Sequence, residues 1–372
     1  MTGFPRKRAR ALAATALAAS TLAVGTVAAA DAPQQRWQTE VFALIGPPGY
    51  PALPHVLNDR VYEGTYTNPG GDDQPSRVLE FTADGTLLRS WTISGQDLSA
   101  EHGIQVTGHD SLGGLVLNDR TPARTLLLDP KTGAQTGYAE YADLPLCSPG
   151  AAPTTCSNAL EDQPPMPNVS AWGPDGSLYT TDFQQAVIWR VPPGGGPAEA
   201  WLSDPALDGA AVGTASIALA PDRRSLLVAQ SASRVGDPTT GRVFSIPIGP
   251  GGEPGPITTL WESRPGDAPD GLAVAESGRI YLTLIGPGAN QLVVLDPSGA
   301  EVERFPVAPA SGENGSTVPF DSPAGVAFLD DRLLVANQSF FAGDPAHQAL
   351  LDVAVGEPGL PVLVPPDAGR PR

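Results

Sequence analysis

Residues 167–193 read PNVSAWGPDGSLYTTDFQQAVIWRVPP and contain three short apolar runs separated by turns. The runs lie at 169–172, 177–181 and 187–191, and Pro, Gly and Asp separate them. Short runs rich in Val, Ile, Tyr, Trp and Thr between such breakers are typical of antiparallel β-strands in a meander. No apolar pattern at helical spacing survives so many breakers. The stretch therefore predicts strands.

The same pattern recurs along the chain. Residues 269–297 repeat it in full (PDGLAVAESGRIYLTLIGPGANQLVVLDP), residues 214–247 and 323–337 repeat it in part, and divergent copies start at Pro54 and Glu101. The equivalent positions, here called axial positions, are His55, His102, Asn168, Ala215, Asp270 and Ala324. Their separations of 47, 66, 47, 55 and 54 residues match one four-stranded blade each. We therefore predict an all-β fold, a six-bladed β-propeller of four-stranded antiparallel blades.

The N-terminal residues have the pattern of a signal peptide. Four basic residues between Arg6 and Arg10 precede a weakly apolar stretch at 11–25, and Ala28 to Ala30 suit signal peptidase. We predict cleavage near Ala30 and a secreted mature protein, a retained membrane anchor being the alternative. Residues 31–365 are then one propeller domain and residues 366–372 a frayed tail. Segment 37–45 is expected to supply the strand that closes the ring against the last blade.

The charge of the chain limits its partners. The formal net charge is −18 for the full sequence and −22 without residues 1–30, which hold four basic residues and no acidic ones. Nucleic acid and anionic membranes require a basic surface, so neither is an expected partner. We expect instead a monomer that handles a small-molecule substrate or ligand.

The two cysteines lie close together in a loop rich in Pro, Ala and Thr. Cys147 and Cys156 are nine residues apart, and export would permit them to form a disulfide. A catalytic thiol is the weaker alternative, because no basic partner is near in sequence. The loop is expected to line the rim of the channel mouth, as long propeller loops commonly do.

Four of the six axial residues carry polar side chains, and the first strand of each propeller blade lines the central axis. His55, His102, Asn168 and Asp270 are therefore expected to converge on one channel. Oxygen donors such as Asn and Asp suit Ca²⁺, and a His that titrates near neutrality suits a general base. Purely structural roles, such as capping turns or bonding a neighbouring strand, remain open for each residue.

These residues lie in motifs that resemble a known superfamily. PNVSAWGPDGSLYTTD (167–182) and DAPDGLAVAESGRIYL (267–282) are similar to the calcium-dependent six-bladed propellers of gluconolactonase and regucalcin, paraoxonase and arylesterase, and strictosidine synthase-like proteins. The resemblance covers roughly residues 40–360. It implies a divalent cation, possibly Ca²⁺, at Asn168 and Asp270. HGIQVTGHDSLGGLVLND (102–119) resembles the paraoxonase segment of the catalytic dyad, which implies His102 as the base, with Asp119 near the second dyad position. His55 is then a substrate-binding candidate.

The sequence also departs from the superfamily pattern. The usual first-blade Glu has no counterpart between Pro51 and His55, and Ala215 stands where a second calcium-binding Asn is expected. Two hypotheses therefore remain. One is a secreted hydrolase of the lactonase or arylesterase type, with a cation and a histidine base in the channel. The other is a non-enzymatic propeller that binds a ligand or a protein and has lost the full metal set.

Overall fold

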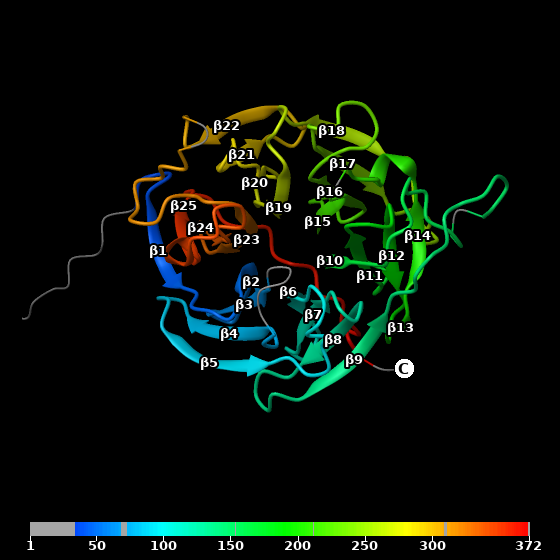
Figure 1. Ribbon diagram of the computed structural model, residues 1–372, viewed down its shortest axis with the longest axis horizontal. Coiled ribbons are helices and arrows are strands. Elements are labelled where there is room, and N and C mark those ends of the chain that lie inside the picture. The colour runs from blue at the N-terminus through cyan, green and yellow to red at the C-terminus, as the bar shows by residue number, and fades with distance from the viewer. Residues whose placement is uncertain (1–33, 68–72, 153, 211, 309–310, 371–372) are drawn as a thin grey trace, which may run out of the picture. The chain divides into compact units, whose positions relative to one another are not determined.

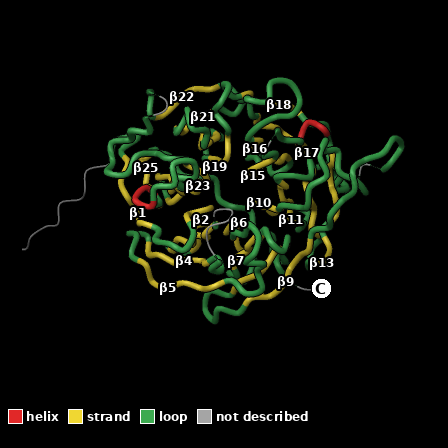
Figure 2. Tube along the Cα trace, in the orientation of Figure 1, coloured by secondary structure: helices red, strands yellow, loops and turns green. Residues whose placement is uncertain are grey.

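The computed structural model describes residues 34–67, 73–152, 154–210, 212–308 and 311–370 (Figure 1). Over these residues the chain is all-β, with two short 3-10 turns at Pro205–Leu207 and Pro345–His347 as its helical segments (Figure 2). The predicted signal peptide, residues 1–30, lies outside the described residues. Within the described part of the chain, no helix is both long and apolar enough to cross a membrane.

The strands form six sheets, each of which is one blade of a propeller. In blade order the strands are β2 (Tyr50–Leu57), β3 (Arg60–Tyr66), β4 (Arg77–Thr82) and β5 (Leu87–Thr92); β6 (Ile104–His109), β7 (Leu115–Asp119), β8 (Arg124–Leu128) and β9 (Gln135–Glu140); β10 (Pro167–Trp172), β11 (Leu178–Asp182), β12 (Val187–Val191) and β14 (Glu199–Ser203); β15 (Thr214–Leu219), β16 (Ser225–Gln230), β17 (Arg242–Pro247) and β18 (Thr258–Glu262); β19 (Pro269–Val274), β20 (Ile280–Leu284), β21 (Gln291–Leu295) and β22 (Glu301–Phe305); and β23 (Pro323–Leu329), β24 (Arg332–Asn337), β25 (Ala349–Ala354) and β1 (Thr39–Leu44). The short strand β13 (Gly196–Pro197) adds a parallel fifth strand beside β9. The prediction of six four-stranded antiparallel blades is confirmed.

The inner strands of the six blades form a closed ring. β2 contacts β6, β6 contacts β10, and the series continues through β15, β19 and β23 back to β2 (Figure 1). The ring is completed by β1, which comes from the N-terminal side and pairs antiparallel with β25 of the last blade. The expectation that segment 37–45 closes the ring is therefore confirmed.

The core of the molecule lies between the blades. The second strands β11 and β20 are buried along their whole length, since they are covered by a neighbouring blade on each face. Outer strands such as β5 are largely exposed. Large side chains such as Trp189 (1% exposed) fill the space between adjacent sheets, and each such burial stabilises the fold by roughly 1.5–3 kcal/mol.

The C-terminal segment is packed and not frayed over its described length. Figure 1 shows it, in red, running from blade 6 across the centre of the ring. Leu360 N–H donates to the Val274 carbonyl, and near the other end Ser111 donates to the Ala368 carbonyl through both N–H and Oγ. Ala368 is 1% exposed. The prediction of a frayed tail from residue 366 is therefore wrong as far as Arg370.

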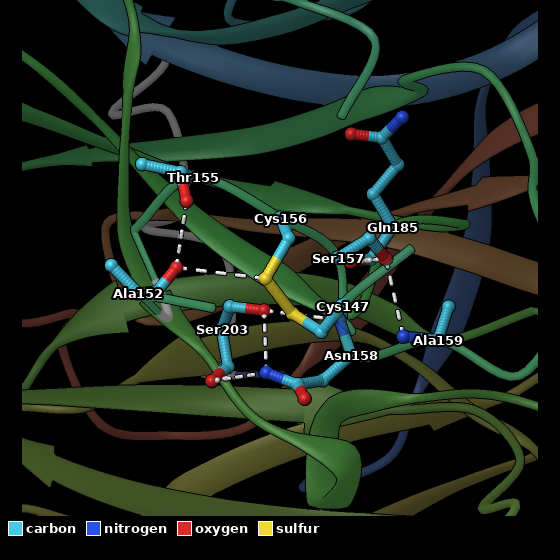
Figure 3. The surroundings of a disulfide bond; sticks show 9 residues. All are labelled: Cys147, Ala152, Thr155, Cys156, Ser157, Asn158, Ala159, Gln185 and Ser203. Carbon is cyan, nitrogen blue, oxygen red and sulfur yellow. Dashed lines mark hydrogen bonds between the residues drawn. A yellow bond between two sulfur atoms is a disulfide. The ribbon is translucent and has the colours of Figure 1, made fainter. Parts of the chain in front are cut away.

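Cys147 and Cys156 form the predicted disulfide (Figure 3). Just beyond it, Asn158 Nδ2 donates to both the carbonyl and the Oγ of Ser203 on β14, and Ser157 Oγ donates to the Gln185 carbonyl. These bonds fasten the base of the loop to blade 3. Figure 1 shows the rest of the loop pointing outward beyond β14. The outward-pointing part of the loop therefore does not line the channel rim, and its base is anchored to Ser203 on the outer strand and to Gln185 in the turn between β11 and β12.

Candidate functional site

Asn168 and Asp270 lie at the end of the channel where the inner strands begin, here called the start face. Each follows a Pro that opens the inner strand of its blade, Pro167 in β10 and Pro269 in β19. In both strands the pairing register shifts just after this point. Because of this shift, Asn168 and Asp270 have no directly paired residue on the second strand and are not part of the regular alternation of side chains between the two faces of the sheet. They occupy equivalent positions in two blades.

The group that joins them is Arg120, which follows β7 in blade 2. Its Nη2 donates to Asn168 Oδ1 at 2.8 Å, and its Nη1 lies 3.4 Å from Glu101 Oε1. Arg120 and Asp270 are close enough for their charges to interact, since each shifts the pKa of the other. Asn168 Nδ2 donates in turn to the Ala215 carbonyl of blade 4. One cationic side chain thus connects residues of three blades.

Two aromatic rings hold the guanidinium in place. The Arg120 Cζ lies 4.3 Å from the ring centroid of Tyr66 and 4.7 Å from that of Phe183. Tyr66, Phe183 and Arg120 occupy equivalent positions in blades 1, 3 and 2. Each directly follows the residue of the second strand that pairs with the start of the inner strand. Desolvated cation–π contacts of this kind are worth about 2 kcal/mol or more. They compensate part of the cost of burying a charge that is only 9% exposed.

Several polar groups of this cluster have no protein partner. Among buried side-chain atoms of the described residues, Arg120 Nε and Tyr50 Oη make no hydrogen bond. Tyr50 packs against Tyr66, with ring centroids 5.2 Å apart. Burial raises the pKa of Tyr50 well above its ordinary value, so its hydroxyl stays neutral. Buried polar groups are normally hydrogen-bonded, so unpaired ones in a single cluster favour a site for a polar ligand.

Asp270 is the titratable group of the cluster. Burial raises its pKa from 3.8 to about 6, and the positive charge of Arg120 opposes part of that rise. The residue is partly exposed to solvent. A carboxylate with a pKa close to neutral is suited to proton transfer at ordinary pH. We refer to Arg120, Asn168, Asp270, Tyr50 and Glu101 as the start-face cluster.

His102 has been predicted as the base, but its imidazole is held by backbone groups. It lies two residues before β6 and is fully buried. Its Nδ1 is 2.8 Å from the Ala100 carbonyl and its Nε2 is 2.8 Å from the Gln74 carbonyl. Both ring nitrogens are therefore engaged, and the geometry is that of a residue that ties two loops together.

Asp119, the predicted partner of His102, is engaged elsewhere. Its Oδ2 accepts from Arg124 Nε and Nη2 at 3.0 and 2.9 Å, and its Oδ1 accepts from Gln96 at 2.8 Å. Burial raises the pKa of Asp119, and these donors oppose the rise. The structure thus gives Asp119 an ion pair with Arg124 within blade 2, and the hydrogen bonds found for His102 go to the Ala100 and Gln74 carbonyls and not to Asp119.

His55 is not at an axial position. Pro51 of β2 has the same place in the strand pairing as Pro167 of β10 and Pro269 of β19. The axial residue of blade 1 is therefore the next residue, Ala52. His55 lies three residues after it. The predicted alignment of blade 1 was displaced by three residues because the Pro that marks the start of an inner strand occurs at both position 51 and position 54. His55 Nε2 instead lies 2.9 Å from His109 Nδ1, in the half of the channel away from the start face.

The start-face cluster does not fit a calcium site built on Asn168 and Asp270. Ala52, Ala215 and Ala324 stand at three of the axial positions and offer no side-chain oxygen. Asn168 Oδ1 already accepts from Arg120, whose positive charge would repel a cation. Over the described residues no group of three or more His, Cys, Asp and Glu is placed to hold a metal ion.

Sequence reasoning missed Arg120 because an Arg after the strand end Leu-Val-Leu-Asn-Asp resembles an ordinary surface turn. A signal does exist in the repeats. At the equivalent point the other blades carry uncharged residues, namely Tyr66, Phe183, Ser231, Ile285 and Gln338. A single charge among equivalent positions, flanked in adjacent blades by two aromatic residues, would have indicated a cation–π site.

Comparisons with known proteins agree on the fold. No model of a known protein family matches the chain, and no curated protein sequence matches it. Solved structures do. A putative gluconolactonase is similar with a TM-score of 0.54 and 16% identity, over 89% of this chain and 95% of that one. Regucalcin from Agrobacterium tumefaciens, described as a calcium-binding protein, has a TM-score of 0.56 and 16% identity over 87% and 98%. A luciferin-regenerating enzyme has a TM-score of 0.59 and 12% identity over 88% and 98%. At these identities the likeness establishes the six-bladed fold of gluconolactonase and regucalcin, and the fold alone.

Proposed function

We propose that this chain is an exported hydrolase of lactones or aryl esters, whose reaction takes place at the start-face cluster with Asp270 as the base. The single observation that carries the proposal is the pairing of Asp270, whose pKa is about 6, with an Arg120 that retains unbonded N–H groups. The predicted cation and His102 have no part in this reaction. The gluconolactonase among the similar structures is in keeping with the substrate class.

The reaction needs one proton acceptor and one group that stabilises negative charge. The Asp270 carboxylate takes a proton from water, and the oxygen of that water bonds to the carbonyl carbon. The carbonyl oxygen becomes an oxyanion, which N–H groups of Arg120 stabilise. When the C–O bond to the leaving alkoxide breaks, the proton on Asp270 passes to that alkoxide, which leaves a carboxylic acid and an alcohol. Each of the two roles typically contributes about 10²–10⁴ in rate.

Arg120 is suited to its role because its geometry is fixed before substrate binds. The rings of Tyr66 and Phe183 set the plane of the guanidinium, and Asn168 sets its rotation. A guanidinium carries five N–H donors, of which Asn168 and Glu101 engage two. Donors that are already oriented need no reorganisation when charge develops, and this is the largest source of electrostatic catalysis.

The second candidate function is binding without turnover. The observation that favours it is the fastening of Arg120 on several sides, by Asn168, by Glu101 and by the ring of Tyr66. In that case the same cluster recognises a carbonyl or carboxylate group, and the ligand leaves unchanged.

The test is hydrolysis of a panel of lactones and aryl esters by the mature chain, measured across pH 4–9 with and without EDTA. We expect turnover that rises through an apparent pKa of about 6 and is unchanged by EDTA. Asp270→Asn should lower kcat/KM about 10²–10⁴-fold and abolish the pH step. Binding without turnover by every compound would support the second candidate. Turnover that survives in Asp270→Asn would refute this base.

The matched control is Asp352→Asn. Burial raises the pKa of Asp352 to about 6 as well, but this residue pairs with Arg332 inside blade 6. A general effect of removing a buried carboxylate would appear in both variants. An effect on catalysis should appear only in Asp270→Asn.

A further inference from the structure

The half of the channel away from the start face contains a cavity of about 440 Å³, a size typical of small-molecule sites. Its walls are the later parts of the six inner strands, and its lid is the C-terminal segment 358–363, here called the strap. The lining is mostly aliphatic and includes Val169, Ile217, Ala218, Ala273 and Val326. The cavity lies in the described part of the chain, and the reaction proposed above does not use it.

The strap is fastened at its two ends and unbonded between them. On the blade 5 and 6 side, Gly359 N–H donates to the Asp330 carbonyl and Leu360 N–H donates to the Val274 carbonyl. On the blade 2 and 3 side, Val364 and Ala368 pack against Trp172 and its neighbours. Among the described residues, no backbone hydrogen bond joins residues 361–364 to the walls. The cavity is thus roofed by a segment that can lift without breaking a sheet.

One polar feature stands out in this aliphatic cavity. His55 faces it, and His55 Nε2 lies 2.9 Å from His109 Nδ1. His55 is 6% exposed, and its contact with His109 engages Nε2 and not Nδ1. Burial lowers the pKa of both imidazoles, that of His55 to about 3, so the pair is neutral near pH 7.

A neutral imidazole pair presents a reversible hydrogen-bonding group. If His55 Nε2–H donates to His109, the His55 Nδ1 is an acceptor, and if His109 Nδ1–H donates to His55, the His55 Nδ1 carries a proton and donates. The pair therefore suits a carbonyl or a hydroxyl equally. A charged group suits the inner part of the cavity less well, because an ion there would lose its hydration among aliphatic side chains, and the charged lining residues Arg223 and Asp330 are exposed.

We propose that this cavity is a second binding site, which holds a small uncharged molecule with an apolar body and one carbonyl or hydroxyl group against the His55–His109 pair. The aliphatic walls provide affinity through apolar burial, and the histidine pair fixes the orientation of the polar group. The strap gives access. This site is independent of the reaction at the start-face cluster.

The test follows fluorine NMR of 4-fluoroacetophenone and 4-fluorobenzyl alcohol in the presence of the mature chain, with 4-fluorobenzoate as the charged counterpart. Neither the ketone nor the alcohol is an ester, so hydrolysis does not consume them. We expect line broadening that saturates for the ketone and the alcohol, with at least tenfold weaker binding of the benzoate.

Two variants locate the probe. Ala218→Leu adds three carbon atoms to the cavity wall and should weaken binding at least tenfold, and His55→Phe should weaken it about fivefold or more while keeping the cavity apolar. Ala171→Leu fills the neighbouring wall, on β10, and is the alternative if Ala218→Leu does not fold. Asp270→Asn should leave binding unchanged. The proposal is overturned if no uncharged probe binds, if the benzoate binds equally well, or if Asp270→Asn weakens binding as much as the wall variants do.

Discussion

The two ends of the channel are built from the same six strands and differ in what they bury. The start face buries a charge, with Arg120 between two rings and Asp270 beside it. The far half buries the neutral imidazole of His55 beside mostly aliphatic side chains, in contact with the partly exposed His109. The difference shows that a propeller channel is not one environment.

The electrostatics of the two ends make the contrast testable. Asp270 has a raised pKa, so its charged form is the costly one and appears as pH rises. His55 has a lowered pKa, so its charged form is also costly but appears as pH falls. Asp270 should therefore reduce the stability of the fold as pH rises from about 4 to 6, and the histidine pair should reduce it as pH falls below 6.5.

Removing the positive charge of the start face should have the largest effect on stability. Arg120→Met leaves Asn168 Oδ1 without its donor and Asp270 without its favourable charge. We expect a loss of roughly 3–4 kcal/mol in the free energy of unfolding. The pKa of Asp270 should also rise above about 6, which carboxyl ¹³C NMR would measure. Arg124→Met is the control, because it breaks the ion pair with Asp119 in the same blade. An equal rise in the Asp270 pKa in Arg124→Met would contradict the assignment.

The second largest effect is the loss of stability that the His55–His109 pair should cause at acid pH. Unfolding gives His55 its ordinary pKa of 6.5 in place of about 3, so the unfolded chain binds protons that the folded chain does not. Stability present at pH 7 is therefore lost as pH falls below 6.5, by roughly 3 kcal/mol at pH 4.5. In His55→Phe this contribution should be absent, and urea unfolding at pH 7 and 4.5 measures it. The same slope in the wild type and in His55→Phe would show that His55 is not the group responsible.

The opposite sign should appear for Asp270. Its folded pKa of about 6 exceeds its unfolded value of 3.8, so stability falls as pH rises from about 4 to 6. Asp270→Asn should remove this fall and make the fold about 2 kcal/mol more stable at pH 7, even as hydrolysis is lost. A variant that gains stability while losing activity is the expected signature of a functional group. A net loss of stability at pH 7 would mean that Arg120 depends on Asp270 more than the pKa indicates.

The smallest effect is expected where neither end is involved. The Cys147–Cys156 disulfide closes a short loop fastened to the outer strand β14. Changing both residues to Ser should cost at most about 2 kcal/mol, most of it in local order of the loop. Thermal melting should shift by a few degrees or less, and both the hydrolysis and the probe binding described above should remain. A loss of either would place this loop nearer to the channel than its anchors do.

The fold was predictable because its cues are local. Pro-Asp-Gly turns and four-residue apolar runs specify strands wherever they occur, and six copies specify a ring. The site was less predictable for two reasons. A Pro marks the start of an inner strand, and blade 1 has one at position 51 and another at position 54. Aligning the blade on Pro54 assigns the axial position to His55, whereas the structure gives it to Ala52. The long side chain of Arg120 reaches Asn168 in the next blade, and the sequence pattern within one blade does not predict contacts with another blade.

The pairing of β1 with β25 has a consequence for how the protein is made. Thr39 lies opposite Val353, a residue 314 positions later in the sequence, so the two strands that complete the last blade come from the two ends of the domain. During synthesis the earliest strand emerges with no partner, while blades 1 to 5 can form from neighbouring sequence as each is translated. The ring of blades can close only after translation reaches Ala354, the last residue of β25. In a nascent chain arrested before that residue, β1 should have no partner strand.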